Sequence, residues 1–518
     1  MKCCDMRKML FLCGAVLLVL LIAAALEAHR AQSWLVDYVR ERTIATLQQD
    51  FAGDVEFDKL QISVLPQVVF HGNGLVVKQT NRSNLPPLIR IREFWLEVGP
   101  WDLLKTVHHV HKLSLEGLVI VVPPRRERTA VSSGPAHSKR TRPAFKIHID
   151  EIATDDAELD ILLKDPLKPP RVFQIHHLTL YDAGLGQAMK YHATLSNPLP
   201  AGEIESLGMF GPWQAEEPRL TPLAGNYTLS NADLASFRGL SGTLTSEGHF
   251  QGSLEHIDVQ GETVTPNFSL GISGHPVPLE TEFHAVVDGS NGNTMLDHVR
   301  AKLLDSVITA HGGILRMPGQ RYRRISLYAE SHDAKLENFL RLALKADRPP
   351  MTGKINFQTR IDIPPGAGVI ADRLGLSGQF DISSARFSQL NIQEKAAKLS
   401  RRSQGQTDDD NPGSVVSNFS GQFVLQNALM TFSHLVFGVP GASVHLDGTY
   451  ALRGEDVDFR GDLRLQARLS QTTRGWKAAL LKPFDPIFEK QGAGTLLPIK
   501  ITGTGSDPKF GVDIHRVF

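Results

Sequence analysis

The stretch Lys354–Ile363, KINFQTRIDI, decides the fold. Its apolar residues are Ile355, Phe357, Ile361 and Ile363. They alternate with the polar residues Lys354, Asn356, Gln358, Arg360 and Asp362. Alternation with a period of two places one set of side chains against an apolar surface and the other set in water. The stretch therefore predicts a β-strand with one apolar face.

The same alternation recurs on both sides of this stretch. Toward the C-terminus, apolar residues alternate with polar ones in Leu463–Leu469, LRLQARL. Toward the N-terminus, Phe145–Asp150 alternates in the same way, and apolar residues return at Leu159, Ile161 and Leu163. We interpret this second region as a hairpin that turns at Thr154–Asp156. Gly, Asn and Asp residues separate the strands, and no strand–helix–strand rhythm appears, so the chain is predicted to be mainly β from Val55 onward.

One short internal repeat supports a sheet built from similar units. Ser377–Ile382 (SGQFDI) recurs 43 residues later as Ser420–Leu425 (SGQFVL), and an alanine follows each copy at the same distance, at Ala385 and Ala428. Repetition of a strand unit predicts a sheet extended by adding similar pieces. Two copies in a β-rich chain also arise by coincidence, and both interpretations stay open.

Composition excludes several classes of protein. The 518 residues include 55 Lys and Arg and 55 Asp and Glu, so the formal net charge is +0 and the chain lacks the basic footprint of a general nucleic-acid binder. All three cysteines, Cys3, Cys4 and Cys13, precede the β-rich body. That body therefore has no cysteine for a disulfide or a metal site.

The N-terminal segment predicts an export or anchoring signal. Met9–Leu26 is an uncharged apolar run whose helical length, about 27 Å, approaches the roughly 30 Å bilayer core. Lys2, Arg7 and Lys8 precede the run, which predicts a cytoplasmic N-terminus and a body outside the cytoplasm. A cleaved signal peptide is the alternative, because small residues stand near its end at Ala23, Ala25 and Ala28.

Helices are expected to be few and short. We expect one helix over Ser33–Gln49, just after the apolar run. A second is expected over Lys335–Lys345, with Asp333 as its N-cap, because Leu336, Phe339, Leu340 and Ala343 share one face. A further helical turn is expected over Lys477–Leu481 before Pro483.

Two polar stretches are expected to be flexible loops. They are Pro123–Pro143, rich in Pro, Ser and Arg, and Ser400–Ser414, SRRSQGQTDDDNPGS. Neither has enough apolar residues to bury. The first is basic, through Arg125, Arg126, Arg128, Lys139, Arg140 and Arg142. Such a loop either contacts anionic lipid headgroups or is simply solvated.

Two clusters contain residues of the types that form catalytic or metal sites. His108, His109 and His111 could supply imidazoles to a metal, but no carboxylate or cysteine stands nearby in the sequence at a supporting spacing, which favours a polar strand edge. Asp408–Asp410 resembles part of a calcium loop, yet Pro412 stands where a ligand is needed and no Glu closes the loop. No nucleotide-binding, hydrolase or metalloprotease motif occurs. The prediction is no enzyme, no catalytic residue, no cofactor and no metal.

The two ends of the chain resemble AsmA-type bacterial envelope proteins. At the N-terminal end the resemblance rests on the apolar run, Phe51–Val55, Leu60–Pro66 and Leu113–Ile120. At the C-terminal end it rests on Gly461–Leu463, Asp485–Phe488, Gly492–Thr495, Pro498–Thr504 and Pro508. The resemblance is diffuse between about residues 150 and 350.

The resemblance implies an inner-membrane anchor, a periplasmic body and a curved antiparallel sheet with an apolar concave face, linked to phospholipid movement toward the outer membrane. The expected fold is thus an elongated antiparallel sheet, groove-like or in parts sandwich-like. An open groove would shelter acyl chains, whereas closed sandwiches would favour a scaffold that assists outer-membrane protein assembly. The expected regions are 1–30 (tail and transmembrane anchor), 31–123 (N-terminal β region), 124–144 (basic loop), 145–350 (middle β region) and 351–518 (C-terminal β region with a loop at 400–414).

Overall fold

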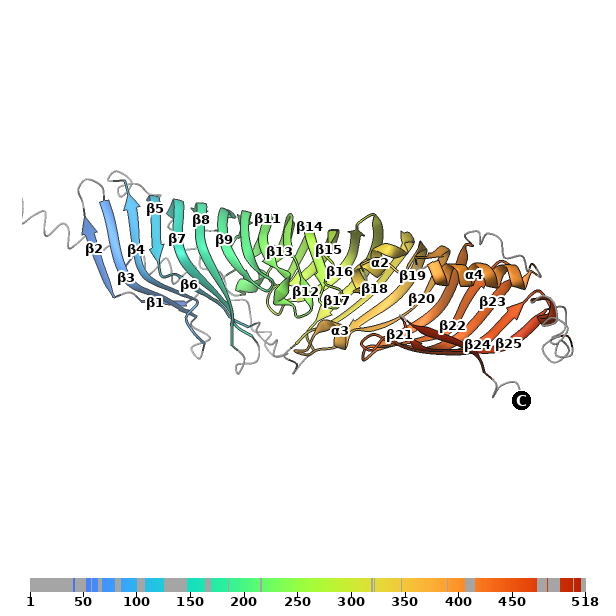
Figure 1. Cartoon of the computed structure of the whole chain (residues 1–518). Helices are drawn as coiled ribbons and strands as arrows, with labels where there is room; N and C mark the ends of the chain where they lie inside the picture. The colour runs from blue at the N-terminus through green and yellow to red at the C-terminus, as the bar shows by residue number, and fades with distance from the viewer. Residues whose placement is uncertain are drawn as a thin grey trace, which may run out of the picture. The chain divides into compact units, whose positions relative to one another are not determined.

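A computed structural model describes most of the β-rich body (Figure 1). The described residues are 41, 53–56, 58–63, 68–79, 85–99, 108–124, 147–163, 169–184, 186–214, 217–317, 320, 322–345, 347–388, 390–404, 406, 415–472, 482, 494–505 and 507–513. They form two compact units. Unit 1 comprises residues up to 196 together with 204–226 and 251–255, and unit 2 comprises 197–203, 227–250 and the residues from 256 onward.

Unit 1 contains most of the N-terminal strands. They are β1 (Gly53–Glu56), β2 (Lys59–Ser63), β3 (Val68–Gln79), β4 (Ile89–Val98), β5 (His108–Glu116), β6 (Val119–Val122), β7 (Ile147–Ile161) and β8 (Arg171–Gly184). Unit 1 also holds the 3₁₀ helix η2 (Pro218–Leu220). Four strands have residues in both units: β9 (Met189–Pro198), β10 (Ala201–Phe210), β11 (Pro222–Asp233) and β13 (Thr243–Ser253).

Unit 2 contains the other strands and the helices. The strands are β12 (Leu240–Ser241), β14 (His256–Leu270), β15 (Val277–Asp288), β16 (Asn293–Leu303), β17 (Ser306–Leu315), β18 (Arg324–Lys335), β19 (Met351–Ile363), β20 (Gly375–Phe387), β21 (Ser417–Gln426), β22 (Leu429–Val439), β23 (Ala442–Ala451), β24 (Asp456–Leu465), β25 (Thr495–Thr504) and β26 (Pro508–Val512). The helices are η3 (Leu234–Ser236), α2 (Leu336–Ala343), α3 (Ile370–Arg373), α4 (Leu390–Ser403) and η4 (Leu469–Thr472). The predicted mainly β fold is confirmed.

Unit 1 is a mixed sheet, so the expectation of purely antiparallel pairing is wrong. Strands β5 and β6 both pair antiparallel with β4, and both pair parallel with β7. Gly117, at φ 65°, stands between β5 and β6. Parallel pairing requires a connection of a dozen or more residues. The chain between Val122 and Ile147 is long enough for that return.

The expected hairpin at Thr154–Asp156 is also wrong, because β7 runs through it as one strand. Thr154 is buried, and Asp156 takes a left-handed φ of 54°. The pairing of β7 with β8 skips Asp156, since Asp155 lies opposite His177 and Ala157 opposite Ile175. The register is the same on both sides of Asp156 and His176, so the polar residues lie within one continuous strand and do not reverse the chain.

Unit 2 is an antiparallel meander from β14 to β26, in which each strand pairs with the next one in the sequence. The alternation predicted in Lys354–Ile363 is confirmed: Ile363 is buried at the end of β19, whereas Arg360 is exposed. In β24, Leu465 is buried and Arg464 is exposed, also as predicted.

The two copies of the SGQF repeat lie on neighbouring strands and pair with each other. Within the β20–β21 register, Gly378 lies opposite Phe423 and Phe380 lies opposite Gly421. The phenylalanine of each copy therefore stands beside the glycine of the other, and the two rings are 6.1 Å apart. Glycine leaves the space that a neighbouring aromatic ring occupies, a device that also fixes strand register.

Helix α2 confirms the prediction for Lys335–Lys345 with a shorter range and a different start. Lys335 occupies the N-cap position in extended conformation, without a side-chain cap hydrogen bond. Asp333 has a left-handed φ of 51° inside β18 and is not the cap. Leu336 and Leu340 pack against Ile382 and Ala385 of β20, as their shared face predicts.

Helix α4 overturns the first part of the loop expected at Ser400–Ser414, because it extends to Ser403. Ser400 and Ser403 are buried, and their hydroxyls donate to the carbonyl oxygens of Pro440 at 2.8 Å and Leu399 at 2.5 Å. Ala396 and Ala397 are buried on the same helix. Small residues and satisfied hydroxyls let a polar sequence pack. Residues 407–414 lie outside the described residues.

Several expectations concern residues that the structure does not describe. They are the transmembrane run Met9–Leu26, the helix Ser33–Gln49 except Glu41, the basic loop after Pro124, the turn Lys477–Leu481, and Asp408–Asp410. Among the described residues, no helix has the length and apolar character needed to cross a membrane.

Gly378 tests the packing of the repeat. A Cβ at this position would meet the Gln358 carbonyl oxygen at 2.2 Å, so we expect Gly378→Ala to lower the free energy of unfolding by about 1–3 kcal/mol. Gly438 in β22 has nothing within 4 Å of such an atom, and Gly438→Ala is the matched control with little expected loss. Urea unfolding followed with hydrogen exchange of β20 and β21 measures both. Equal unfolding midpoints for the two variants would contradict the packing argument.

Candidate functional site: an uncharged sheet face

The register of unit 2 aligns one face of its strands into a continuous uncharged surface. Residues directly opposite each other on paired strands project from the same face. One such row crosses β14 to β26: Gly261, Phe283, Val299, Ala310, Ala329, Thr359, Gly378, Phe423, Phe432, Gly448, Phe459, Ile501 and Phe510. We call this side of β14–β26 the uncharged face. None of the described strand positions on it holds Asp, Glu, Lys, Arg or His.

Phenylalanines concentrate on the C-terminal part of the uncharged face. The rings of Phe419 and Phe437 are 4.7 Å apart, and Phe432 and Phe459 are 5.8 Å apart. Phe380 joins the second pair at 6.3 Å from Phe432. Edge-on and tilted contacts of this kind stabilise aromatic pairs beyond the area that they bury. Except for Phe459, these rings remain partly accessible to solvent.

Helices α2 and α4 cover part of the uncharged face (Figure 1). The Phe339 ring of α2 lies 5.3 Å from Phe357, nearly perpendicular to it. Leu399 of α4 packs against the buried Val439. Lys395 of α4 places its ammonium 5.6 Å from the ring centroid of Phe510, in reach of a cation–π contact. The two short helices do not form a second layer over the whole meander.

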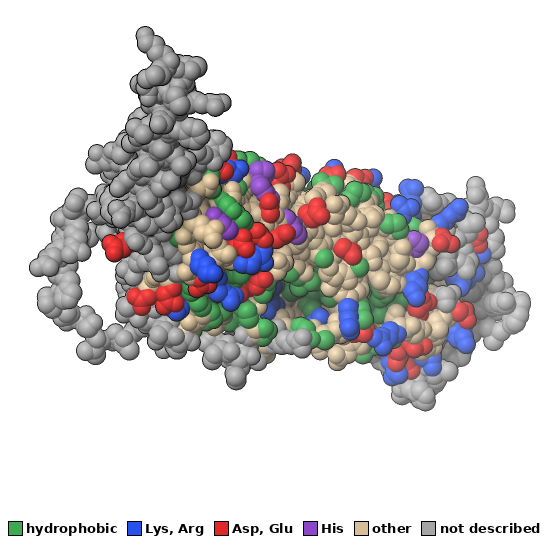
Figure 2. Space-filling view, turned by 90° about the vertical axis from the view of Figure 1, so that its left-hand side faces the viewer, with side chains coloured by type: hydrophobic (Ala, Val, Ile, Leu, Met, Phe, Trp, Pro, Cys, Tyr) green, Lys and Arg blue, Asp and Glu red, His purple; other side chains and the backbone are tan. Residues whose placement is uncertain are grey.

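The opposite face of unit 2 is polar and carries ion pairs between neighbouring strands. Arg324 holds Asp362 through two hydrogen bonds, of 2.6 and 2.9 Å, and the bond to Asp362 raises the pKa of Arg324 above its usual value. Lys302 contacts Glu280 at 3.1 Å. Exposed pairs of this kind add little stability, but they keep this face in water. Figure 2 views the molecule from the side on which the N-terminal strands lie, and it shows acidic, basic and hydrophobic side chains intermingled on that surface.

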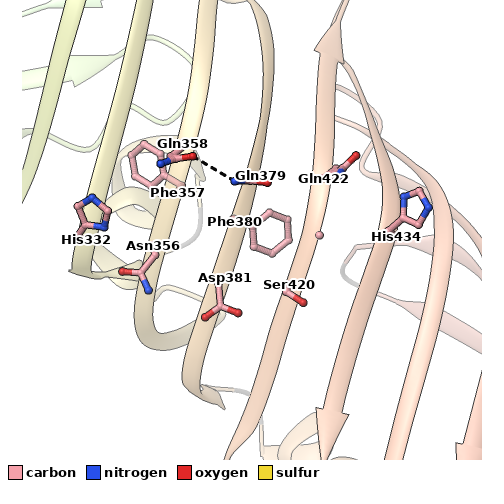
Figure 3. A pocket seen from close by; sticks show the side chains of 11 residues that line it. His332, Asn356, Phe357, Gln358, Gln379, Phe380, Asp381, Ser420, Gln422 and His434 are labelled. Carbon is pink, nitrogen blue, oxygen red and sulfur yellow. Dashed lines mark hydrogen bonds between the residues drawn. The ribbon is translucent and has the colours of Figure 1, made fainter.

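A shallow hollow of about 450 Å³ opens among polar side chains of β19, β20 and β21 (Figure 3). Gln379 donates to the amide oxygen of Gln358 at 3.2 Å, and Gln422 lies opposite Gln379 on the next strand. These glutamines alternate along their strands with the phenylalanines of the uncharged face. Gln379 and Gln422 of the SGQF repeat line the hollow, and so do Phe357 of β19 and Phe380 of β20.

A second arrangement, missed from the sequence, sets tyrosine hydroxyls against serines. Tyr227 bonds the Ser246 hydroxyl at 3.1 Å, and Ser246 donates to the Glu262 carbonyl oxygen at 2.8 Å. In unit 1, Tyr191 and Ser206 form the same contact at 2.9 Å. Burial raises the pKa of both tyrosines above the usual value. The Tyr191 hydroxyl lies against Gly225 and the Tyr227 hydroxyl against Gly261. Each paired serine begins a Ser-x-Gly sequence, Ser206–Gly208 and Ser246–Gly248, which could have signalled the arrangement.

Tyr227 gives a pH-dependent prediction. Its pKa is raised by burial, so the unfolded chain ionises first, and the stability present below about pH 10 is lost as pH rises through the folded pKa. Tyr227→Phe is expected to cost about 0.5–1.5 kcal/mol at pH 8 through the lost hydrogen bond, and less at pH 10.5. Urea unfolding at the two pH values measures the gap. If the stability difference between the unaltered protein and Tyr227→Phe were the same at both pH values, the raised pKa of Tyr227 would be refuted.

The histidines of unit 1 lie in a different setting from the one expected. His109 of β5 lies opposite His148 of β7, and Asp150 follows His148 on the same face. His109 Nε2 is 3.0 Å from Asp150 Oδ1, and His111 Nδ1 is 3.4 Å from Asp150 Oδ2. No carboxylate is near these histidines in the sequence, but the parallel pairing of β5 with β7 brings Asp150 beside them. The side chain of His108 is not described.

No protein-family model, curated protein or solved structure matches this chain.

Proposed function

We propose that this chain is a membrane-anchored protein of the bacterial periplasm that shelters or conveys phospholipid acyl chains along the uncharged face. The observation that carries the proposal is the unbroken uncharged row across β14–β26 of unit 2. An apolar surface that no second sheet of the described residues covers needs another occupant to shield it from water. The resemblance of the chain ends to AsmA-type proteins supports the same assignment.

The dimensions and energetics suit an acyl chain. Neighbouring strands are about 4.8 Å apart, so the row from β14 to β26 extends roughly 58 Å, several times the half-thickness of a bilayer core. Each methylene kept from water contributes about 0.8 kcal/mol, so ten sheltered methylenes contribute on the order of 8 kcal/mol. A charged side chain on the row would oppose this binding through its desolvation cost. Because no charged side chain stands on the row, an acyl chain can lie at many positions along the face without a specific pocket.

Adjacent residues of β20 test the proposal. Leu376 lies on the uncharged face, and Ser377 lies on the polar face. In Leu376→Glu we expect several-fold less phospholipid to co-purify with the full-length protein, and less acyl-chain photo-crosslinking. Ser377→Glu, with the same charge one residue away, is expected to retain both. Lipid mass spectrometry and circular dichroism give the measurement and the folding control. Equal lipid recovery from the two variants, or none from the unaltered protein, would defeat the proposal.

The anchor and the location are part of this proposal and have their own test. Met9–Leu26 would hold the N-terminus in the cytoplasm, and residues from about 31 onward would lie in the periplasm. Protease added to spheroplasts is expected to digest the body while the inner membrane stays sealed. Protection of the body until the membrane is broken would place it on the other side.

A scaffold that binds outer-membrane or periplasmic proteins is the second candidate, favoured by the last strand of the meander. Among the described residues β26 pairs with β25, and its Phe510 and Val512 are 59% and 46% exposed. An exposed apolar edge strand is a surface to which another chain can add a strand. Lipid recovery that is unaffected by Leu376→Glu would favour this function over the first.

A further inference from the structure

We propose that His109, His148 and Asp150 on the polar face of unit 1 bind a divalent transition-metal ion, with His111 positioning the carboxylate. The three side chains come from two strands, β5 and β7, that pair in parallel. One nitrogen from each histidine and one Asp150 oxygen all lie within 4.8 Å of one another. This site lies in unit 1 and is independent of the uncharged face of unit 2.

The distances suit a shared ion. Nε2 of His109 lies 3.0 Å from Asp150 Oδ1, and Nε2 of His148 lies 3.6 Å from the same oxygen. Zinc holds nitrogen and oxygen ligands at about 2.0–2.2 Å, so two of its ligands in tetrahedral geometry are about 3.4 Å apart. The two contacts with Asp150 bracket that separation. Side-chain movements of a fraction of an ångström would complete a three-ligand set.

The register explains why the ligands converge. His109 and His148 are directly opposed, and Asp150 is two residues beyond His148 on the same strand face. The segments His109–His111 and His148–Asp150 thus run side by side in the same direction, so that His111 and Asp150 are neighbours as well. If β5 and β7 were antiparallel with His109 still opposite His148, Asp150 and His111 would lie on opposite sides of this histidine pair.

His111 occupies a supporting position. Its Nδ1 lies 3.4 Å from Asp150 Oδ2, whereas the contacts of His109 and His148 are with Oδ1, and its ring packs edge-on to His109 at 5.3 Å. A group that holds the free oxygen of a ligating carboxylate fixes the direction of its other lone pairs. All four side chains are one-third to just over one-half exposed, so an ion and its water ligands can enter from solvent.

The donor set favours late first-row ions over magnesium or calcium. Imidazole nitrogen suits zinc, copper and nickel, whereas magnesium and calcium prefer sites made of oxygen ligands. Two imidazoles and one carboxylate leave at least one position for water, as in open zinc sites. Zn²⁺ is therefore the probe for the test, and Mg²⁺ is its negative control.

Zinc titration of the full-length protein against a fluorescent chelator tests the site. Asp150→Asn and His148→Asn are expected to lose one equivalent of Zn²⁺ or to weaken its binding more than tenfold, and His111→Asn to weaken it about 10-fold. His177→Asn is the matched control, because His177 pairs with Asp155 at 2.7 Å elsewhere on the same sheet and should retain the site. Cys3, Cys4 and Cys13 are common to all variants, so the differences exclude them.

Visible absorption of bound Co²⁺ gives a second readout, since coordination by these ligands shifts its spectrum and Asp150→Asn should abolish the shift. Circular dichroism of each variant reports folding. The proposal is overturned if the unaltered protein takes up no Zn²⁺ at 100 μM free ion (roughly the weak limit of specific protein sites), or if Asp150→Asn and His177→Asn bind it equally.

Discussion

The structure of unit 2 depends on one constraint: exposing the uncharged side of a single-layer sheet to water costs free energy. Each strand from β14 to β26 contributes an apolar or small residue to that side and places its charges on the other. A sheet can hide such a surface only under a second layer or under a ligand. Here α2 and α4 cover a part, and ring-to-ring contacts among phenylalanines cover a little more. The remaining half-buried surface is the feature that any account of function has to explain.

Alternation within one strand is local information, and for that reason it was predictable. Ile363 and Leu465 are buried where the period of two places them, and α2 follows from the spacing of Leu336 and Leu340. Helix α4 was missed because LNIQEKAAKLSRRS is polar overall. Its packing depends on small buried residues such as Ala397, which carry almost no hydropathy signal.

The alignment of strands is not local, and here prediction failed. That Phe423 lies opposite Phe432, or His109 opposite His148, depends on register and on bulges such as the one between Phe432 and Leu435 of β22. A one-residue slip would move every side chain of a strand to the other face. The parallel return of β7 beside β5 could not be inferred from the residues of either strand. Sequence spacing alone therefore does not reveal the histidine–aspartate cluster, whose members come together through this pairing.

The strict neighbour-to-neighbour pairing of unit 2 has a consequence for how such a chain can change length. Because each strand depends on only the two beside it, one hairpin can be inserted or deleted while the remaining pairs keep their register. Each hairpin gained would extend the sheet by roughly 9.6 Å, twice the strand spacing. The SGQF copies on the neighbouring strands β20 and β21 are what duplication of one strand would produce. The length of the sheet can therefore change in small, equal steps.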